Sequence, residues 1–473
     1  MIDYEAHDGL GLAALLRRGE VSAPELLQAA IERIEARNPA LNAVVTPLFD
    51  AARAAVAQGL PDGPFRGVPF LVKELVASVA GTATTFGSRL YSHNTAAADS
   101  EIVARYRRAG LVIVGKTNSP EFGLSPTTES LLYGITRNPW RADLAPGGSS
   151  GGAAAAVAAG LVPAAHATDG GGSIRIPASA CGLFGLKPTR ARITAGPEGG
   201  EGLSGLAVQH VVSRSVRDSA ALLDATAGPL PGDPYTAPPP RRPWLAEVGA
   251  DPGRLRIAFA RRAPGGVPLH PHCVAAVDDA AALCRSLGHE VEEASPDFDA
   301  EALARAFRQA FAANTDANIR RATGGARPRP DQVEPLSAAL AEEGRRLSAA
   351  DLVAALHAMH RQGRRLAAFF ERYDAWLTPT LAQPPLPIGH FDIRSSDVDA
   401  WFDRLLAFLP FTYPFNASGQ PAASLPLFWS PDGLPIGVQF AARAGDEALL
   451  FRLAGQLERA RPWFGRRPVV GVG

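Results

Sequence analysis

Gly147-Gly-Ser-Ser-Gly-Gly152 and Asp169-Gly-Gly-Gly-Ser-Ile-Arg175 are two glycine-rich segments, separated by the alanine-rich run Ala153–Ala159. Glycine loses much conformational entropy on folding, so glycine-dense backbone is kept where a chain takes unusual dihedral angles or closely approaches another group. One segment carries Ser149 and the other carries Ser173. The pattern therefore predicts paired loops that converge on a small site.

The second segment fits the chemistry of amide cleavage. That reaction needs an activated nucleophile, donors for the developing oxyanion and an acid for the leaving amine. The backbone N–H groups of Gly170, Gly171, Gly172 and Ser173 can turn towards one point, forming a nest that suits an oxyanion. Ser173 would be the nucleophile at the end of this nest. By spacing alone, a tight turn or a phosphate site fits the loop equally well.

Lys73 is the strongest candidate for the base. It ends the apolar run Gly67-Val-Pro-Phe-Leu-Val-Lys73, which predicts a buried strand. Burial lowers the pKa of a lysine and makes its neutral amine accessible. Taken alone, Lys73 fits a solvated or salt-bridged lysine beside Glu74 better than it fits a base. His166 is the histidine nearest to Ser173, and we interpret it as a structural, hydrogen-bonded residue.

Ser149 also allows a different interpretation. Gly147-Gly-Ser-Ser-Gly151 matches the G-x-S-x-G nucleophile elbow, in which Ser149 itself would attack. That arrangement needs an acidic residue and a histidine further along the chain. The available histidines have no distinctive context; they are His289, His357, His360 and His390.

Composition limits the class of protein. The 473 residues are 46% hydrophobic and 20% charged, as expected of a soluble globular protein. Lys plus Arg and Asp plus Glu both number 47, so no net field recruits nucleic acid or a membrane. The first residues lack the features of a secretory signal. Cys181, Cys273 and Cys284 are an odd number without metal-ligand spacing. We therefore expect reduced thiols, a cytoplasmic location and no metal site.

Strand and helix signals alternate along the chain, which favours a layered α/β fold. We expect one domain over residues 1–473, with its core densest at 64–195 and a helical insert near 299–410. A hairpin is predicted where residues 423–428 and 436–440 flank Ser430-Pro-Asp-Gly433. Other predicted helices cover 8–37 with a break near 19–22, 50–57, 98–108, 215–226, 272–287 and 446–460; other predicted strands cover 111–114, 255–260, 288–292 and 377–380.

An ordered set of motifs resembles the amidase signature family. The motifs are Gly67–Glu74, Gly115-Lys-Thr-Asn-Ser-Pro-Glu-Phe122, Pro146–Gly152, Thr168–Pro177, Cys181-Gly-Leu-Phe-Gly-Leu-Lys-Pro-Thr189 and Gly419-Gln-Pro-Ala422. The resemblance implies a twisted mixed central sheet covered by helices on both faces.

The same resemblance implies catalytic roles. Ser173 would be the nucleophile, Lys73 the base and Ser149 the bridging serine, preceded by a cis peptide bond. An acyl-enzyme would form on Ser173, with no metal or organic cofactor. Two positions depart from the family pattern: Gly170 stands where isoleucine or threonine is common, and Glu74 where aspartate is common.

Three further motifs look most like one branch of that family, which contains 6-aminohexanoate cyclic-dimer hydrolases, aryl acylamidases and urethane-cleaving amidases. These motifs are Thr136-Arg-Asn-Pro-Trp140, Arg175-Ile-Pro-Ala-Ser179 and Pro414-Phe-Asn-Ala-Ser-Gly-Gln-Pro421. We therefore expect a small-molecule substrate, which is a fairly apolar linear amide, anilide or carbamate. If the chain self-associates, we expect a homodimer. Six aromatic residues are candidates to line its pocket, although plain core packing is the stronger interpretation for each of them. They are Phe307, Phe311, Trp401, Phe402, Phe408 and Phe411.

Two other functions remain open from the sequence. A glutaminase subunit of a tRNA-dependent amidotransferase is the alternative within the same family. A catalytically inactive binding protein is the third, and the presence of Lys73, Ser149 and Ser173 argues against it.

Overall fold

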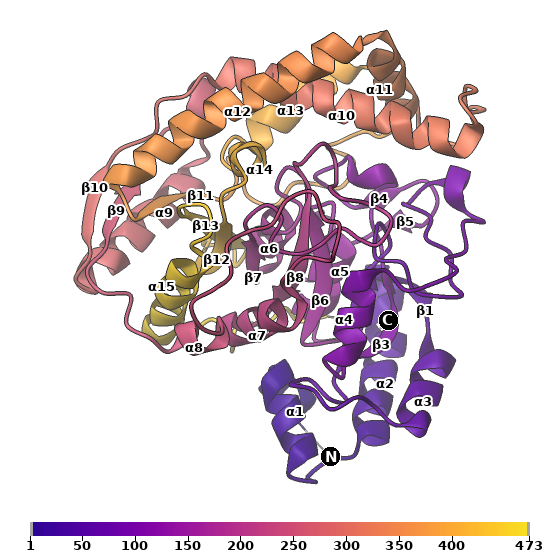
Figure 1. The fold of residues 1–473 in the computed structure, drawn as a ribbon. Helices are drawn as coiled ribbons and strands as arrows, with labels where there is room; N and C mark the ends of the chain where they lie inside the picture. The colour runs from indigo at the N-terminus through magenta and orange to yellow at the C-terminus, as the bar shows by residue number, and fades with distance from the viewer. Residues whose placement is uncertain (1–2, 471–473) are drawn as a thin grey trace.

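A computed structural model describes residues 3–470 of the chain, and one mixed sheet of 11 strands runs through it (Figure 1). The strand order is β1-β3-β2-β6-β8-β7-β12-β13-β11-β9-β10. The β2–β3, β2–β6, β9–β10 and β9–β11 pairs are parallel, and the remaining pairs of this sheet are antiparallel. The strand bounds are β1 Val44–Pro47, β2 Pro69–Lys73, β3 Val112–Thr117, β6 Ala164–Asp169, β7 Phe184–Lys187, β8 Val208–Ser213, β9 Arg256–Phe259, β10 Glu290–Glu293, β11 Ala375–Pro379, β12 Ala422–Trp429 and β13 Pro435–Ala441, with a separate pair β4 Glu129–Ser130 and β5 Gly134–Ile135.

Helices cover both faces of the sheet, as the sequence predicts. Successive side chains of β2 point to opposite faces, so Phe70 and Val72 pack in one apolar cluster and Leu71 in another. The first cluster contains side chains of α1, α4, α7, α9 and α15, and the second contains those of α2, α3, α5 and α6. The helix bounds are α1 Gly9–Arg17, α2 Ala23–Leu41, α3 Phe49–Gln58, α4 Glu101–Arg108, α5 Gly151–Ala158, α6 Arg175–Cys181, α7 Val216–Thr226, α8 Leu245–Val248, α9 Pro271–Ser286, α10 Ala300–Thr323, α11 Pro335–Arg346, α12 Ala349–Arg372, α13 Val398–Phe408, α14 Tyr413–Ser418 and α15 Glu447–Ala460.

The predicted helical stretch near 299–410 forms a layer of its own. Helices α10, α11, α12 and α13 arch over one end of the molecule (Figure 1) and share a third apolar cluster. The same stretch also supplies β11, which pairs with β9 and β13 in the central sheet. β11 lies between these two strands, so the chain that forms the helical layer enters the central sheet between α12 and α13.

Local signals in the sequence place most element boundaries. Ser22 and Glu25 form the expected capping box at the start of α2. The hairpin β12–β13 forms around Ser430–Gly433 as predicted. Several details differ. α2 continues through Pro39 to Leu41, and β3 continues to Thr117. The sequence reasoning predicted neither β6 nor β8, which joins β6 to β7.

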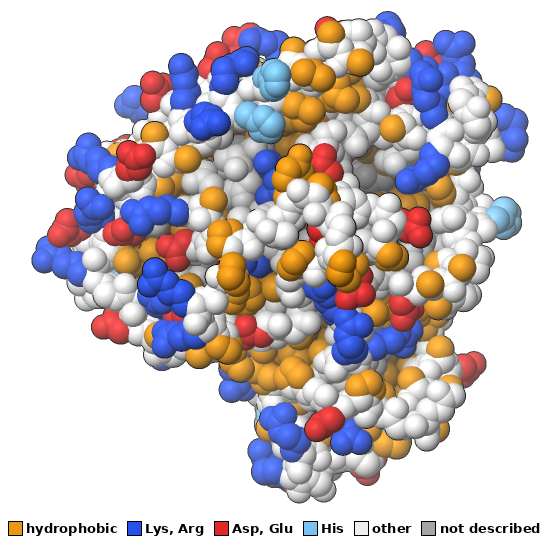
Figure 2. Space-filling view, viewed as in Figure 1, with side chains coloured by type: hydrophobic (Ala, Val, Ile, Leu, Met, Phe, Trp, Pro, Cys, Tyr) orange, Lys and Arg blue, Asp and Glu red, His pale blue; other side chains and the backbone are white. Residues whose placement is uncertain are grey.

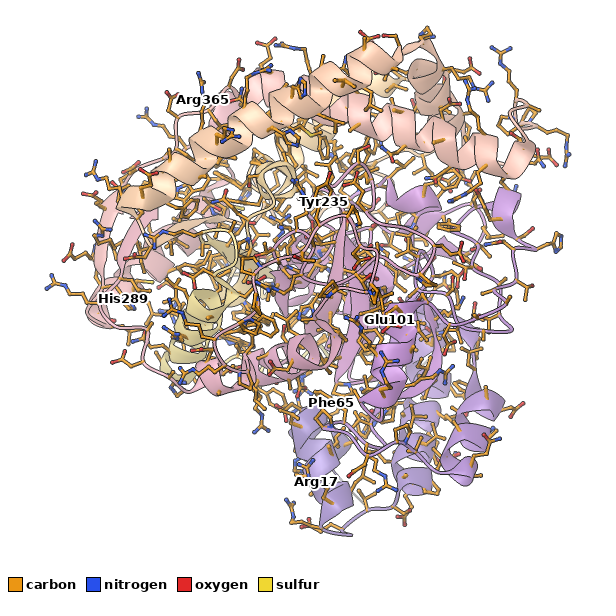
Figure 3. The ribbon with its side chains drawn as sticks, in the orientation of Figure 1. Arg17, Phe65, Glu101, Tyr235, His289 and Arg365 are labelled. Carbon is orange, nitrogen blue, oxygen red and sulfur yellow. The ribbon has the colours of Figure 1, made fainter. Side chains whose placement is uncertain are left out.

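The surface bears charged side chains of both signs, scattered over the visible face (Figure 2). The Pro-rich segment 229–243 crosses this face as predicted, and its Tyr235 is 63% exposed (Figure 3). Cys181, Cys273 and Cys284 are buried free thiols. Among residues 3–470, no helix combines the length and apolar character needed to cross a bilayer.

Two buried carboxyl groups join the helical layer to the loop after β3. The Glu334 backbone N–H, just before α11, donates to Glu121 Oε2 at 2.8 Å, and Leu131 N–H donates to Glu334 Oε1 at 2.9 Å. Glu121 and Glu334 are 2% and 4% exposed. Burial, and then the proximity of Glu121, raises the pKa of Glu334 from 4.5 to about 8.

Glu334→Gln is expected to flatten the pH dependence of stability between pH 5 and pH 8. The folded protein holds a proton on Glu334 that the unfolded chain releases above its ordinary pKa, so the free energy of unfolding falls as pH rises through this window. Glutamine keeps the acceptor for Leu131 and has no proton to release. Melting temperatures at pH 5 and pH 8 test this, with the exposed Glu371→Gln of α12 as control. An equal drop in wild type and Glu334→Gln would contradict it.

Candidate active site

Lys73 ends β2 with its amine enclosed by hydroxyl groups. Its side chain is fully buried, and Nζ lies 2.7 Å from Ser149 Oγ, 3.0 Å from Ser150 Oγ and 2.8 Å from Thr168 Oγ1. Burial lowers the pKa of Lys73 well below its ordinary value, and the charge of Asp169 only partly opposes this. The neighbouring Glu74 pairs with Lys116 at 3.1 Å instead. Lys73 is therefore neither solvated nor salt-bridged to Glu74.

The hydrogen-bond pattern around Lys73 is compatible with a lone pair directed at Ser149. A neutral amine has two N–H donors and one acceptor site. Ser150 Oγ donates to the Thr168 carbonyl at 3.2 Å, so towards Lys73 it can only accept. If the second N–H is given to Thr168 Oγ1, the lone pair faces Ser149 Oγ. The arrangement thus lets Lys73 accept a proton from Ser149.

Ser149 is held in a tightly packed turn. The Gly148–Ser149 peptide is cis, as the resemblance implies. A Cβ added to Gly148 would lie 2.5 Å from the Thr127 carbonyl oxygen, so no other residue fits there. Gly123 also lies close to Ser149, because a Cβ added to Gly123 would be 3.2 Å from Ser149 Oγ. Neighbouring backbone therefore packs closely against the Gly148–Ser149 turn, and Lys73 holds the Ser149 hydroxyl.

The loop from Gly170 to Ser173 lies between β6 and α6, and its N–H groups are free. Among residues 3–470, the backbone N–H groups of Gly170, Gly171, Gly172 and Ser173 donate to no protein acceptor. Gly171, Gly172 and Ser173 are buried, and buried N–H groups without a partner are rare in folded proteins. Ser173 is 9% exposed, and within the described residues its hydroxyl has no hydrogen bond to Ser149, Lys73 or any other group. The loop is thus available to a ligand.

Each glycine of this loop meets a different later segment of the chain. An added Cβ would lie 3.0 Å from Leu203 Cδ2 at Gly170, 2.9 Å from Phe307 Cζ at Gly171 and 2.6 Å from Thr412 Oγ1 at Gly172. Gly172 also has φ 144°, which side chains rarely allow. The glycines are therefore needed for close packing as well as for backbone geometry. The Leu203 side chain lies next to Gly170, close to the place that a side chain at position 170 would take.

A buried ion pair holds the two ends of the loop together. Arg175 Nε and Nη2 each donate to Asp169 at 2.9 Å, and both side chains are fully buried. Although burial opposes ionisation, Arg175 lowers the pKa of Asp169. Asn416 and Gln439 accept from Arg175 at 2.7 Å each. The sequence reasoning assigned no role to this network, although Asp169 and Arg175 flank the glycines.

His166 has the structural role that the sequence predicts. Its Nδ1 accepts from the Lys73 backbone N–H at 3.3 Å, and its Nε2 faces Gln209 Oε1 at 3.3 Å. Burial lowers the pKa of His166 to about 3, so the ring is neutral. Ser149 Oγ is hydrogen-bonded to Lys73. Within the described residues no histidine is hydrogen-bonded to Ser149 Oγ, and this includes the four histidines that the elbow interpretation would use.

The six aromatic candidates for a pocket are all core residues, none more than 6% exposed. Five of them share the third apolar cluster, and Phe411 packs with Trp376 in another cluster. Phe307 is the one of these that borders the glycine loop, at Gly171. The others contribute to the packing of the helical layer.

Comparison with known proteins identifies the family. The Amidase family model matches residues 25–451. The chain is 41% identical to the 6-aminohexanoate-cyclic-dimer hydrolase of Paenarthrobacter ureafaciens, over 98% of this chain and 96% of that protein. A solved structure of 6-aminohexanoate cyclic dimer hydrolase superposes with TM-score 0.93 at 39% identity, covering 99% of this chain and 100% of the other. A bacterial aryl acylamidase of the amidase signature family superposes with TM-score 0.87 at 27% identity, covering 98% and 99%.

These similarities span nearly the whole chain, and the sheet order and glycine loops described above lie within them. The chain therefore belongs to the amidase family, has the fold of the amidase signature enzymes, and is a hydrolase of carbon–nitrogen bonds in non-peptide amides.

Proposed function

We propose that this amidase cleaves fairly apolar linear amides, anilides or carbamates with a Ser-Ser-Lys triad of Ser173, Ser149 and Lys73. The observation that carries the proposal is the fully buried Lys73 amine, which is bonded at 2.7 Å to Ser149 Oγ and, within residues 3–470, to no carboxylate. Burial outweighs the opposing charge of Asp169 and favours the neutral form of Lys73, which is the form that accepts a proton.

The proposed reaction begins with proton transfer. Ser173 Oγ attacks the carbonyl carbon of the substrate while its proton passes to Ser149, whose own proton passes to Lys73. Ser149 can take this part because a hydroxyl both donates and accepts. The proton then returns along the same route to the leaving nitrogen, the C–N bond breaks, and the acyl group stays on Ser173 as an ester. Water, activated in the same way, releases the acid.

The free N–H groups of Gly170, Gly171, Gly172 and Ser173 would stabilise the oxyanion. They are fixed before substrate arrives, because Asp169 and Arg175 hold the ends of the loop and Thr412 Oγ1 donates to the Gly171 carbonyl at 2.6 Å. Preorganised donors of this kind contribute about 2.7–4 kcal/mol each to transition-state stabilisation. No metal or organic cofactor takes part in these steps.

The substrate class follows from the apolar surroundings of the loop. Leu203 and Phe307 border Gly170 and Gly171, which suits an apolar acyl group better than the polar chain of glutamine. The similar proteins named 6-aminohexanoate-cyclic-dimer hydrolase and aryl acylamidase support the same choice. We therefore favour this class over a glutaminase subunit of an amidotransferase.

Labelling of Ser173 tests the triad. A serine-directed fluorophosphonate is expected to add one acyl-mimicking group to the protein, and peptide mass spectrometry should place it on Ser173. A label on Ser149 would favour the nucleophile elbow and overturn the proposal.

Substrate preference tests the class. An N-acyl anilide is expected to be turned over with higher kcat/KM than the primary amide of the same acid, because both the acyl group and the ring can be buried. Glutamine serves as the polar comparison. A clear preference for the small primary amide or for glutamine would contradict the proposed class.

A further inference from the structure

The proposed catalytic residues are buried, and partly exposed residues lie in neighbouring segments. Lys73, Ser149 and Thr168 are 0%, 2% and 7% exposed. Partly exposed neighbours are found in two segments, Phe122–Gly123 and Gly202–Ser204, together with Gly170 of the glycine loop.

Both segments place a large apolar residue in a left-handed conformation. Phe122 and Leu203 each have φ 52°, a region that bulky residues rarely occupy. Phe122 N–H donates to the Phe86 carbonyl at 2.7 Å, and Leu206 N–H donates to the Leu203 carbonyl at 3.1 Å. Such backbone persists where the surrounding structure enforces it, and it is concentrated at ligand-binding sites.

The second segment is held from the helical layer. Ser204 follows Leu203 with φ 52°, and its Oγ accepts from Asn314 Nδ2 of α10 at 2.8 Å. Gly205 has φ 80° and its carbonyl accepts from Arg190 Nε. These contacts fix the turn that carries Leu203.

The Leu203 side chain and the backbone next to Phe122 lie beside residues of the site. The backbone next to Phe122 touches the bridging serine, since a Cβ on Gly123 would lie 3.2 Å from Ser149 Oγ. Leu203 Cδ2 lies 3.0 Å from where a Cβ on Gly170 would be. Phe122 and Leu203 both pack, partly exposed, on the apolar cluster that contains Phe307. Leu203 thus places an apolar side chain beside Gly170, the first residue of the loop that ends at Ser173.

We infer that Leu203 forms one wall of an acyl subsite that takes an apolar acyl chain, and that its side chain sets the width of this subsite. Gly170 has no side chain that could limit the width of the subsite, and the Leu203 side chain lies next to Gly170. The inference rests on the proposed function, because it assigns the acyl half of the substrate that Ser173 would attack.

A chain-length series tests the subsite. Initial rates are measured with N-acyl-4-nitroanilides from acetyl to decanoyl on the wild type, Leu203→Ala and Leu203→Phe. Leu203→Ala is expected to move the maximum of kcat/KM to longer chains, and Leu203→Phe to move it to shorter ones. At the longest chains the two variants should differ by about tenfold or more, the usual effect of a methylene group or two in an apolar pocket. Opposite shifts cannot come from partial unfolding, which would lower all rates together.

Leu347→Ala is the matched control. Leu347 is also partly buried against the same cluster, but it lies at the end of α11. Its variant should keep the wild-type chain-length profile.

The outcomes separate the two proposals. If the wild type hydrolyses the anilides but both Leu203 variants keep its profile, the subsite is wrong and the proposed function stands. If the wild type hydrolyses no member of the series and Ser173 takes no label, the proposed function itself is wrong.

Discussion

The Ser173→Ala variant is expected to lose turnover of any amide substrate by about 10⁶-fold in kcat, the scale seen when a serine nucleophile is removed from a catalytic unit. Alanine removes the only hydroxyl at the end of the glycine loop and leaves the loop itself intact. The Ser173 hydroxyl makes no hydrogen bond within the described residues, so its loss should hardly change the melting temperature. Rates of anilide hydrolysis and thermal melting together check this.

Ser179→Ala is the control for the Ser173 variant. Ser179 lies in α6, the helix that follows the glycine loop, and is also buried, but its hydroxyl accepts from Gly437 N–H at 2.9 Å. Its loss should lower the melting temperature and leave kcat within about threefold, since surface and core changes away from the chemistry act on stability. Turnover by Ser173→Ala within tenfold of wild type would remove Ser173 as the nucleophile.

Lys73→Met is expected to lower kcat by about 10²–10⁴-fold, the range for a general base. Methionine keeps the apolar stem and removes the amine that Ser149, Ser150 and Thr168 surround. In the double variant with Ser173→Ala, the loss should be no greater than in Ser173→Ala alone, because residues that act as one unit are not additive. Losses that multiply would contradict a shared proton route.

The pH profile gives an independent check on Lys73. Activity should rise with pH as Lys73 loses its proton, and the plateau should be reached well below the ordinary lysine value of 10.5, because burial lowers this pKa. A rise centred near 10.5 would show a solvated lysine. Lys187→Met is the matched control: Lys187 is also fully buried, with its pKa lowered by burial, but it bonds to the Pro188 carbonyl. Its variant should keep the wild-type pH profile.

The sequence by itself determined the local features of this protein. Alternating strand and helix signals predicted the α/β fold, and the capping box at Ser22 and the hairpin at Ser430–Gly433 were found where their residues predict them. The apolar run that ends at Lys73 predicted a buried strand with a lysine at its end. These features could be predicted because hydrogen bonding and side-chain alternation over a few residues encode them.

Only the tertiary structure decided which distant residues meet. The pairing of β11 with β9 and β13, the contact of Thr168 with Lys73 and the packing of Leu203 on Gly170 join segments that carry no mutual signal in the sequence. Asn416 lies 241 residues from Arg175 and still bonds to it. Such contacts depend on how complete elements pack around a shared core, where shape and burial select the partner, so no local pattern could have assigned them.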